Sequence, residues 1–254
     1  MLPAPAPARV IRDLVYLTDD EAALHMDAYV PKAPGRYPGV LLVNGDATED
    51  VIATAKDWGV YRSYGAHLSA RGLVGLPFNH RSTRSGARRS VVEAQVSAAL
   101  DHARAHAAQL DLDRERIGLW VFSAAGAFAL ARTLRERPPY VRAVAGFYTI
   151  WDVSPFAERE GLPAEDVARW SAVAALGDSA TGLPPILVGR AGRDAPPLKT
   201  GADRFIARAL ELDADLSVWN HPTGQHGFDI RDDDARSREI IQAALDFFAR
   251  RLAD

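Results

Sequence analysis

The sequence predicts an α/β fold with a mostly parallel central sheet, helices on both of its faces and an antiparallel hairpin at the N-terminal edge. Short apolar runs alternate with helical patterns, as they do when crossover helices join parallel strands. Several of these runs are apolar at every position, which is typical of strands buried on both faces. A chain of 254 residues falls within the range of one such domain.

The first half of the chain predicts the hairpin and the first parallel strands. In order, it predicts strands at 9–16, 23–30, 39–43 and 73–78, with helices at 60–71 and 91–109. The hairpin turns at the acidic residues 19–21, and a Pro/Gly loop precedes the third strand. The polar segment 44–58 predicts a long loop and therefore a candidate site rim. A basic loop over 79–90 follows the fourth strand.

The second half repeats the alternation of strands and helices. It predicts strands at 117–122, 141–148, 185–188 and 216–219, with helices at 126–137, 200–212 and 234–252. Residues 113–116 predict a turn, and 149–182 predicts a cap-like insertion with short helices. Residues 1–8 alternate Pro and Ala and predict a flexible arm, which leaves 9–254 as a single domain. Asp232, Asp233 and Asp234 resemble a helix N-cap run more than a metal site.

The composition excludes several classes of function. A net charge of −3 with 25% charged residues indicates neither nucleic acid nor an anionic membrane as a partner. The chain has no cysteine, which excludes disulfides, thiolate zinc sites and cysteine nucleophiles. The N-terminus lacks a secretory pattern, and no apolar run is long enough to cross a bilayer. We expect a cytoplasmic protein with no metal or organic cofactor, and the oligomeric state stays open.

Ser123 is the candidate nucleophile. The apolar run 117–122 stops at this serine, small residues follow, and an Ala-rich helical pattern begins. A strand, sharp turn and helix of this kind present a hydroxyl to a cleft, with a helix N-terminus behind it that favours developing negative charge. Val121 and Ala125 occupy positions where small residues or glycine are usual. The alternative is a serine that only caps the helix.

A general base and an acid are predicted downstream of Ser123. His226 follows the last strand in a Gly-containing loop that can project an imidazole into a cleft. Asp194 ends a Gly-rich turn after the strand before it, where a carboxylate can orient that imidazole. His221 is the competing base, although its place near the strand end favours a wall residue. Asp152 is the competing acid, because it follows the preceding strand.

An oxyanion pocket and a substrate pocket are expected beside the serine. The backbone N–H groups of Ala124 and of the Gly45–Asp46 region are the candidate oxyanion donors. The candidate substrate-pocket residues are Asn44, Trp58, Tyr61, Tyr148 and Trp151. Tyr64 also belongs to the aromatic group near Trp58, which half-buried packing would explain equally well. A basic cluster of Arg81, Arg84, Arg88 and Arg89 could attract a substrate carboxylate, but a solvated face explains it as well.

From about residue 27 to the C-terminus, the chain resembles the α/β-hydrolase superfamily, in particular its dienelactone-hydrolase-like and small serine esterase branches. The residues that carry the resemblance are 26–31, 40–45, 71–74, 79–81, the Ser123 turn, 189–194 and 226–228. The order serine, aspartate, histidine is the order of that superfamily. The resemblance implies a triad of Ser123, Asp194 and His226. The departures are the missing cysteine nucleophile, Val121, Ala125, and Asn44 in place of a histidine.

We therefore expect a serine esterase that cleaves an ester or lactone of a small molecule through an acyl-enzyme. A prolyl-oligopeptidase-like peptidase would share the triad, but such enzymes usually carry an added propeller domain. An acyltransferase would differ only in its acceptor. The altered turn around Ser123 also allows a non-catalytic binding protein with the same fold.

Overall fold

The chain folds around one eight-stranded sheet with strand order β1-β2-β4-β3-β5-β6-β7-β8. The computed structural model describes residues 5, 9–18, 22–84 and 89–253. The strands are β1 (Arg9–Thr18), β2 (Ala23–Val30), β3 (Tyr37–Val43), β4 (Val74–Pro77), β5 (Leu112–Phe122), β6 (Val141–Phe147), β7 (Ile186–Ala191) and β8 (Leu216–His221). The acidic turn 19–21, Arg88 and the predicted arm, apart from Pro5, lie outside the described residues.

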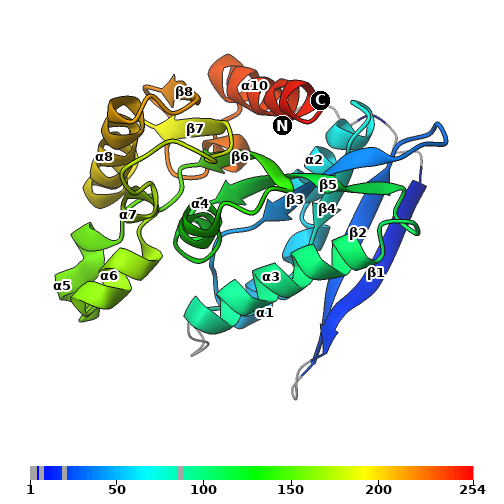
Figure 1. The fold of residues 1–254 in the computed structure, drawn as a ribbon, viewed down its shortest axis with the longest axis horizontal. Coiled ribbons are helices and arrows are strands. Elements are labelled where there is room, and N and C mark those ends of the chain that lie inside the picture. The colour runs from blue at the N-terminus through cyan, green and yellow to red at the C-terminus, as the bar shows by residue number, and fades with distance from the viewer. Residues whose placement is uncertain (1–4, 6–8, 19–21, 85–88, 254) are drawn as a thin grey trace.

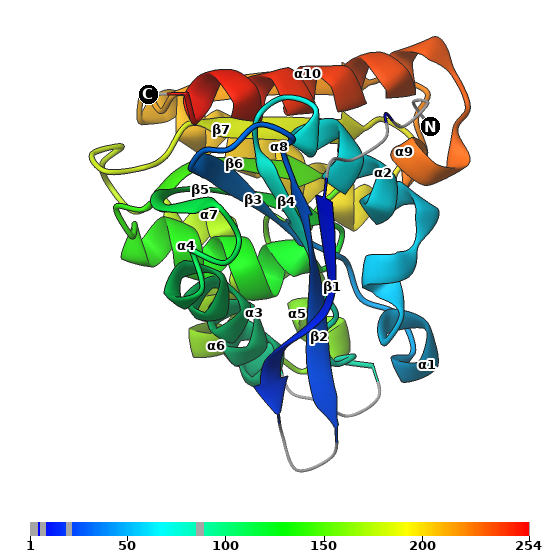
Figure 2. The same cartoon turned by 90° about the vertical axis from the view of Figure 1, so that its right-hand side faces the viewer.

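The sheet is parallel except at its N-terminal edge. β1 and β2 form an antiparallel hairpin that pairs Arg9 with Val30 and Thr18 with Ala23. β2 then pairs antiparallel with β4, and the strands from β4 to β8 pair in parallel. The far end of the hairpin extends beyond the rest of the sheet (Figure 2). The predicted fold class, including its N-terminal hairpin, is confirmed.

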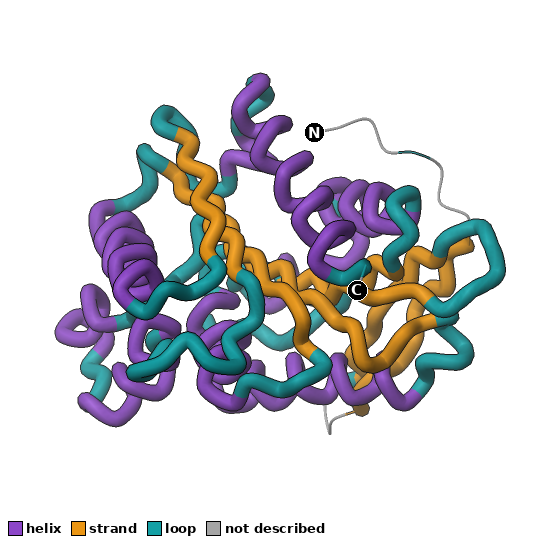
Figure 3. Tube along the Cα trace, turned by 45° about the horizontal axis from the view of Figure 1, so that its top comes forward, coloured by secondary structure: helices purple, strands orange, loops and turns teal. Residues whose placement is uncertain are grey.

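Helices cover both faces of this sheet (Figures 1 and 3). The helices are α1 (Glu49–Ile52), α2 (Gly59–Ser69), α3 (Arg89–Ala105), α4 (Ala131–Glu136), α5 (Ala157–Glu160), α6 (Ala164–Trp170), α7 (Ala172–Ala175), α8 (Pro196–Glu211), α9 (Phe228–Arg231) and α10 (Ala235–Arg251). Residues of α3, α4, α7 and α8 share one hydrophobic core, and residues of α2 and α10 share another.

The central strands feed both cores because successive side chains of a strand point to opposite faces. In β5, Leu119 and Val121 belong to the core under α3 and α8, whereas Trp120 and Phe122 belong to the core under α2 and α10. This alternation explains why the sequence of β5 is apolar at every position from Ile117 onward. A strand that is buried on both faces has no polar face, so its sequence lacks the alternation of polar and apolar residues seen in half-buried strands.

Three segments differ from the sequence expectation. Residues 113–116 are the first half of β5 rather than a turn, and Leu112 pairs with Tyr37 of β3. The expected helix 126–137 begins as a π-helical turn, Gly126–Leu130, before α4. The expected loop 44–58 contains α1 and a short 3₁₀ turn, Ala55–Asp57. The segment 149–182 holds α5, α6 and α7, and its description as a cap-like insertion stays a prediction.

The N-terminus of α10 confirms the predicted capping role of the aspartate run. The Asp234 carboxylate accepts a hydrogen bond of 2.7 Å from the Ser237 backbone N–H. This bond satisfies one of the amides that the first turn of a helix leaves unpaired. Its negative charge also lies at the favourable end of the helix dipole.

A buried ion cluster ties the hairpin to the segment that precedes α2. The Lys56 Nζ lies 2.8 Å from the Asp13 carboxylate, 3.1 Å from that of Asp27 and 3.0 Å from that of Asp57. The Lys56 side chain is 5% exposed and the Asp27 side chain is fully buried. Burial opposes the ammonium charge, but the hydrogen bonds to Asp13, Asp57 and Asp27 outweigh it and raise the pKa of Lys56.

Replacing Lys56 with methionine is expected to lower the free energy of unfolding by about 1–3 kcal/mol, because the buried Asp27 loses one of its two charge partners and keeps only Arg12. The measurement is urea denaturation near neutral pH. The control is Arg9→Met, which breaks the exposed Arg9–Asp111 pair and should cost at most about 1 kcal/mol. Equal losses in the two variants would contradict the structural role of the buried cluster.

Candidate active site

The turn after β5 holds Ser123 in a strained backbone conformation. Ser123 has a φ of 52°, which lies in the left-handed region that residues other than glycine rarely adopt. Its carbonyl oxygen accepts a hydrogen bond of 2.8 Å from the Ile150 N–H and one of 2.6 Å from the Thr149 hydroxyl. These bonds come from the segment after β6, which therefore maintains the turn. Such strain persists only where the surroundings fix it.

The glycine that the turn requires lies three residues after the serine. A Cβ atom on Gly126 would lie 2.1 Å from the carbonyl oxygen of Ile150, so no other residue fits there. Ala125 is fully buried and fits without strain on its own φ of −61°. Val121 is also fully buried, and its cross-strand neighbour in β6 is Gly146, which has no side chain. Val121 is therefore placed beside a residue without a side chain, and Ala125 needs no special backbone conformation.

The structure brings Ser123, His226 and Asp194 together from three different loops. The Ser123 Oγ lies 2.8 Å from His226 Nε2, and His226 Nδ1 lies 2.9 Å from Asp194 Oδ2. The other oxygen of Asp194 accepts a hydrogen bond of 2.8 Å from the Ala195 N–H. The Asp194 side chain is 4% exposed and the His226 side chain 36% exposed. The imidazole is thus accessible, while the carboxylate that contacts it is shielded from water.

The two competing residues lie in other networks. The Asp152 carboxylate accepts hydrogen bonds from the Ser154 N–H and from the side chains of Ser154, Ser171 and Arg204. Burial disfavours its charge, but these bonds outweigh burial and lower the pKa of Asp152. His221 is buried, and its Nε2 lies 3.1 Å from the Ser237 hydroxyl and 3.2 Å from Asp234. Asp152 therefore supports the segment after β6, and His221 supports the start of α10.

The loop after β3 passes directly beside the serine. A Cβ atom on Gly45 would lie 2.8 Å from the Cβ atom of Ser123 and 3.4 Å from its Oγ. The Asp46 carboxylate points to Thr83, from which it accepts hydrogen bonds of the backbone N–H and the hydroxyl. The adjacent Asn44 carbonyl lies 3.1 Å from Nε2 of the buried His80. The segment 80–83 thus holds this loop in place, and its hydrogen bonds direct the Asp46 side chain toward Thr83.

The backbone amides predicted to hold an oxyanion have no competing backbone partner. Among the described residues, the N–H groups of Asp46 and Ala124 donate to no backbone carbonyl. Both belong to segments that border Ser123, one by chain connection and one by the close approach of Gly45. An amide beside the nucleophile with no other acceptor is suited to bind developing negative charge.

Gly45→Ala is expected to lower kcat for a short ester about 100-fold, because the new methyl group displaces Ser123 or the loop by a few tenths of an ångström or more. The measurement is steady-state kinetics with a matched thermal melt. We expect the melting temperature to change by only a few degrees, since the clash is confined to the site. A variant with the kcat of the unaltered protein would contradict the close approach.

The aromatic residues expected in the substrate pocket lie in different environments. Trp58 is half-buried and stacks on the buried Tyr61 with ring centroids 6.0 Å apart. The Tyr148 ring contacts the His226 ring edge-on, with centroids 4.9 Å apart. Trp151 is 1% exposed and stacks on Phe205 of α8, so it packs in the hydrophobic core. Tyr148 is therefore the member of the predicted set that contacts the candidate base.

A buried carboxylate that the sequence did not predict lies near His226. Asp229, three residues after His226, accepts hydrogen bonds of 2.6 Å from the hydroxyls of Tyr64 and Tyr148. Burial raises the pKa of Asp229, and the two tyrosine bonds and the nearby His226 oppose that rise. Burial is also the main cause that raises the pKa of Tyr64 and Tyr148. The only sequence signal was the proximity of Asp229 to His226 along the chain.

The predicted basic cluster is partly neutralised. Arg81 lies 3.4 Å from Glu49, and Arg89 forms an ion pair with Glu160. Arg84 is exposed, and Arg88 lies outside the described residues. Two of the described arginines thus join surface elements to each other. The attraction of a substrate carboxylate by this cluster stays a prediction.

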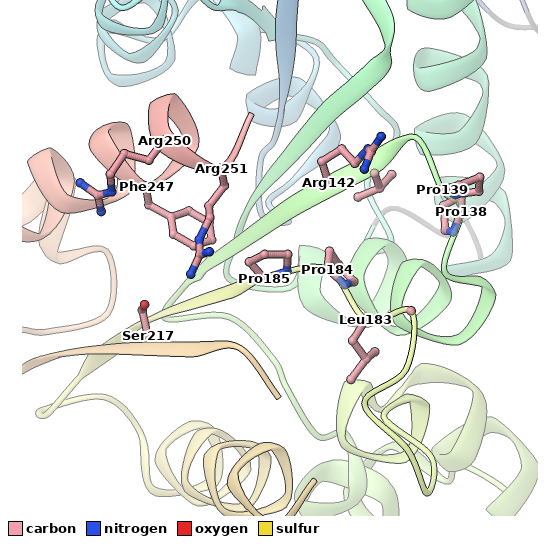
Figure 4. Close-up of a pocket in the computed structure, with 12 residues that line it drawn as sticks. Pro138, Pro139, Arg142, Leu183, Pro184, Pro185, Ser217, Phe247, Arg250 and Arg251 are labelled. Atoms are coloured by element: carbon pink, nitrogen blue, oxygen red, sulfur yellow. The ribbon is translucent and has the colours of Figure 1, made fainter. Parts of the chain in front are cut away.

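Figure 4 shows a cavity of about 600 Å³ that the amino ends of β6 and β7 border. Its walls come from the segments that lead into β6 and β7 and from the last turns of α10. The lining includes Pro138, Pro184, Pro185, Arg142 and Arg250. Because Ser123 follows the other end of β5, this cavity belongs to a different part of the molecule.

The described part of the molecule offers no candidate for a membrane-spanning helix or for a metal-binding group. No helix in it is both long enough and apolar enough to cross a bilayer. Its histidine, aspartate and glutamate side chains form no group of three that could hold a metal ion.

Solved structures of other proteins have a fold similar to that of this chain. No protein-family model matches the chain, and no curated protein matches it in sequence. Esterase 2 of Thermogutta terrifontis, solved as its tabun adduct, is similar in structure, with a TM-score of 0.78, 19% identity and 98% of each chain covered. A truncated carbohydrate esterase from gut microbiota gives a TM-score of 0.79 at 18% identity, covering 99% of this chain and 100% of that one.

A third similar structure is the acetyl ester-xyloside bifunctional hydrolase of Caldicellulosiruptor lactoaceticus. Its TM-score is 0.71 at 16% identity, with 95% of this chain and 96% of that chain covered. Sequence identities this low establish likeness of fold. Together with the strand order of the sheet, the comparisons show that this chain has an α/β-hydrolase fold.

Proposed function

We propose that the chain is a serine hydrolase that cleaves a carboxylic ester or lactone of a small molecule. The observation that carries the proposal is the hydrogen-bonded relay at the turn after β5. Ser123 Oγ lies 2.8 Å from His226 Nε2, and His226 Nδ1 lies 2.9 Å from Asp194. A serine hydroxyl is a weak nucleophile until a base takes its proton, and this arrangement supplies such a base.

In the proposed first half-reaction, neutral His226 donates its Nδ1–H to Asp194 and accepts the Ser123 proton at Nε2. The Ser123 oxygen attacks the carbonyl carbon and forms a tetrahedral intermediate whose oxyanion is held by backbone N–H groups of Ala124 and the Gly45–Asp46 region. The intermediate collapses to an acyl-enzyme, and His226 gives its proton to the departing alcohol oxygen. The Asp194 carboxylate stabilises the imidazolium between these steps.

In the second half-reaction, a water molecule takes the place of the alcohol. His226 accepts one proton of this water while the remaining hydroxyl attacks the acyl carbon. The second tetrahedral intermediate collapses, the ester bond to Ser123 breaks, and the proton returns from His226 to the serine oxygen. The products are the acid and the free enzyme.

The substrate class is proposed from the chemistry of similar structures. Esterase 2 of Thermogutta terrifontis is known with butyrate and with propionate bound, and it is modified by organophosphates such as paraoxon. Other structural neighbours are a carbohydrate esterase and an acetyl ester-xyloside hydrolase. These names support a short acyl group on an alcohol or sugar leaving group. The dienelactone-hydrolase-like branch remains the more specific form of the proposal.

The test is hydrolysis of p-nitrophenyl acetate, propionate, butyrate and octanoate, with dihydrocoumarin as a lactone. We expect saturable hydrolysis of the short aryl esters, with kcat/KM falling toward octanoate. If the protein hydrolyses none of these compounds, the result would contradict the proposal and favour a non-catalytic binding protein with this fold.

A further inference from the structure

Asp229 is a buried carboxylate that the triad does not use. It is 3% exposed and lies in the short helix α9, directly after the loop that carries His226. Each of its oxygens accepts one tyrosine hydroxyl at 2.6 Å, from Tyr64 of α2 and from Tyr148 after β6. Distances of this size are typical of charge-assisted O–H···O⁻ bonds. No lysine or arginine is paired with it among the described residues.

Tyr148 connects this carboxylate to the candidate base. Its backbone φ of 40° lies in the left-handed region, and its N–H donates a hydrogen bond of 2.8 Å to the Gly189 carbonyl. Its hydroxyl is fixed on Asp229, and its ring packs edge-on against the His226 imidazole at 4.9 Å. A strained backbone conformation of this kind persists only where the surroundings fix it.

Tyr64 donates a hydrogen bond to the same carboxylate, but its ring packs against a different neighbour. Its ring stacks on Trp120 of β5 with centroids 4.4 Å apart. Among the described ring contacts, His226 pairs with Tyr148. The two tyrosines therefore share an acceptor while only one of them contacts the imidazole, which makes Tyr64 a matched control for Tyr148.

We propose that Asp229 and Tyr148 are positioning residues for His226: Asp229 fixes the Tyr148 hydroxyl, the Tyr148 ring sets the plane of the imidazole, and the Asp229 charge favours the imidazolium. This proposal rests on the proposed function of the same site. The ionisable groups that surround His226 and Asp229 in the described structure are Asp194, Tyr148, Tyr64 and Tyr61. Of these, Asp194 and Asp229 are the carboxyl groups, and the anionic form of a carboxyl group stabilises a nearby imidazolium.

The first test is Asp229→Asn, which keeps the shape of the side chain and removes its charge. Loss of a negative charge near His226 disfavours the imidazolium, so the acid limb of the kcat/KM profile should move to lower pH by roughly half a unit to one unit. We expect kcat to fall about tenfold with KM within about twofold of its original value. A purely structural residue would lower the whole profile without moving its limb.

The second test compares Tyr148→Phe with Tyr64→Phe, each of which removes one hydroxyl from Asp229. We expect kcat to fall by about 3–10-fold in Tyr148→Phe and by less than about twofold in Tyr64→Phe, because only the first frees a ring that contacts His226. Equal effects of the two variants would overturn the role of Tyr148. This comparison also stands if Asp229→Asn fails to fold.

An NMR titration of the imidazole separates this proposal from the proposed function. The His226 signal, assigned with a His226→Gln variant, should titrate at lower pH in Asp229→Asn than in the original protein. The same midpoint in both proteins would overturn the influence of Asp229, even if the enzyme hydrolyses esters. If the original protein hydrolyses no ester but the His226 midpoint still differs between it and Asp229→Asn, the result contradicts only the proposed function.

Discussion

Ser123→Ala is expected to lower kcat for p-nitrophenyl acetate by about 10⁵–10⁶-fold, because the variant lacks the hydroxyl that is proposed to form the acyl-enzyme. His226 would keep its contact with Asp194, so the fold and the rest of the site should persist. The measurement is initial rates at high enzyme concentration, corrected for hydrolysis in buffer. The two proteins are compared by their observed turnover at a saturating substrate concentration.

The control for this variant is Ser179→Ala, which removes a serine hydroxyl from an exposed loop. We expect its turnover to match that of the original protein. If Ser123→Ala retained more than about 1% of the turnover, Ser123 would be no nucleophile and the strained turn would need another explanation.

Asp194→Asn is expected to lower kcat about 10⁴-fold at neutral pH, since an amide neither stabilises the imidazolium nor fixes the tautomer that takes the Ser123 proton. The geometry that supports this expectation is the 2.9 Å contact between Asp194 and His226 Nδ1. The measurement is kcat across a range of pH, with circular dichroism to confirm folding.

Asp152→Asn is the matched control, because Asp152 was the competing acid in the sequence. Its carboxylate is held by Ser154, Ser171 and Arg204. We expect this variant to lose stability while kcat changes less than about threefold. If Asp152→Asn abolished turnover and Asp194→Asn preserved it, the assignment of the acid would be reversed.

The fold could be predicted because local pattern and tertiary structure agree in the central strands. From Ile117 onward, the side chains of β5 alternate between two cores, which demands a run without polar residues, and that run is visible in the sequence. The first half of β5 was mistaken for a turn because Arg114, Glu115 and Arg116 are polar. They lie in an extended, largely exposed part of the strand, where burial imposes no apolar pattern.

The proximity of Ser123, Asp194 and His226 could be predicted because each follows the carboxyl end of a strand, and such ends meet at one edge of a parallel sheet. The network of Asp229 could not be predicted in the same way. Tyr64 and Asp229 are separated by 165 positions, and both sit in segments whose sequence reads as ordinary packing. The need for glycine at position 126 could not be predicted from the sequence either, because it arises from the Ile150 carbonyl in the segment after β6.

The central claim is that Ser123 is activated by His226, and intact-mass analysis after fluorophosphonate treatment tests it most directly. The experiment compares the original protein with Ser123→Ala and His226→Ala under the same exposure. We predict a single adduct on the original protein that is absent from both variants. An original protein that remains unmodified, or an adduct that persists in Ser123→Ala, would contradict the claim.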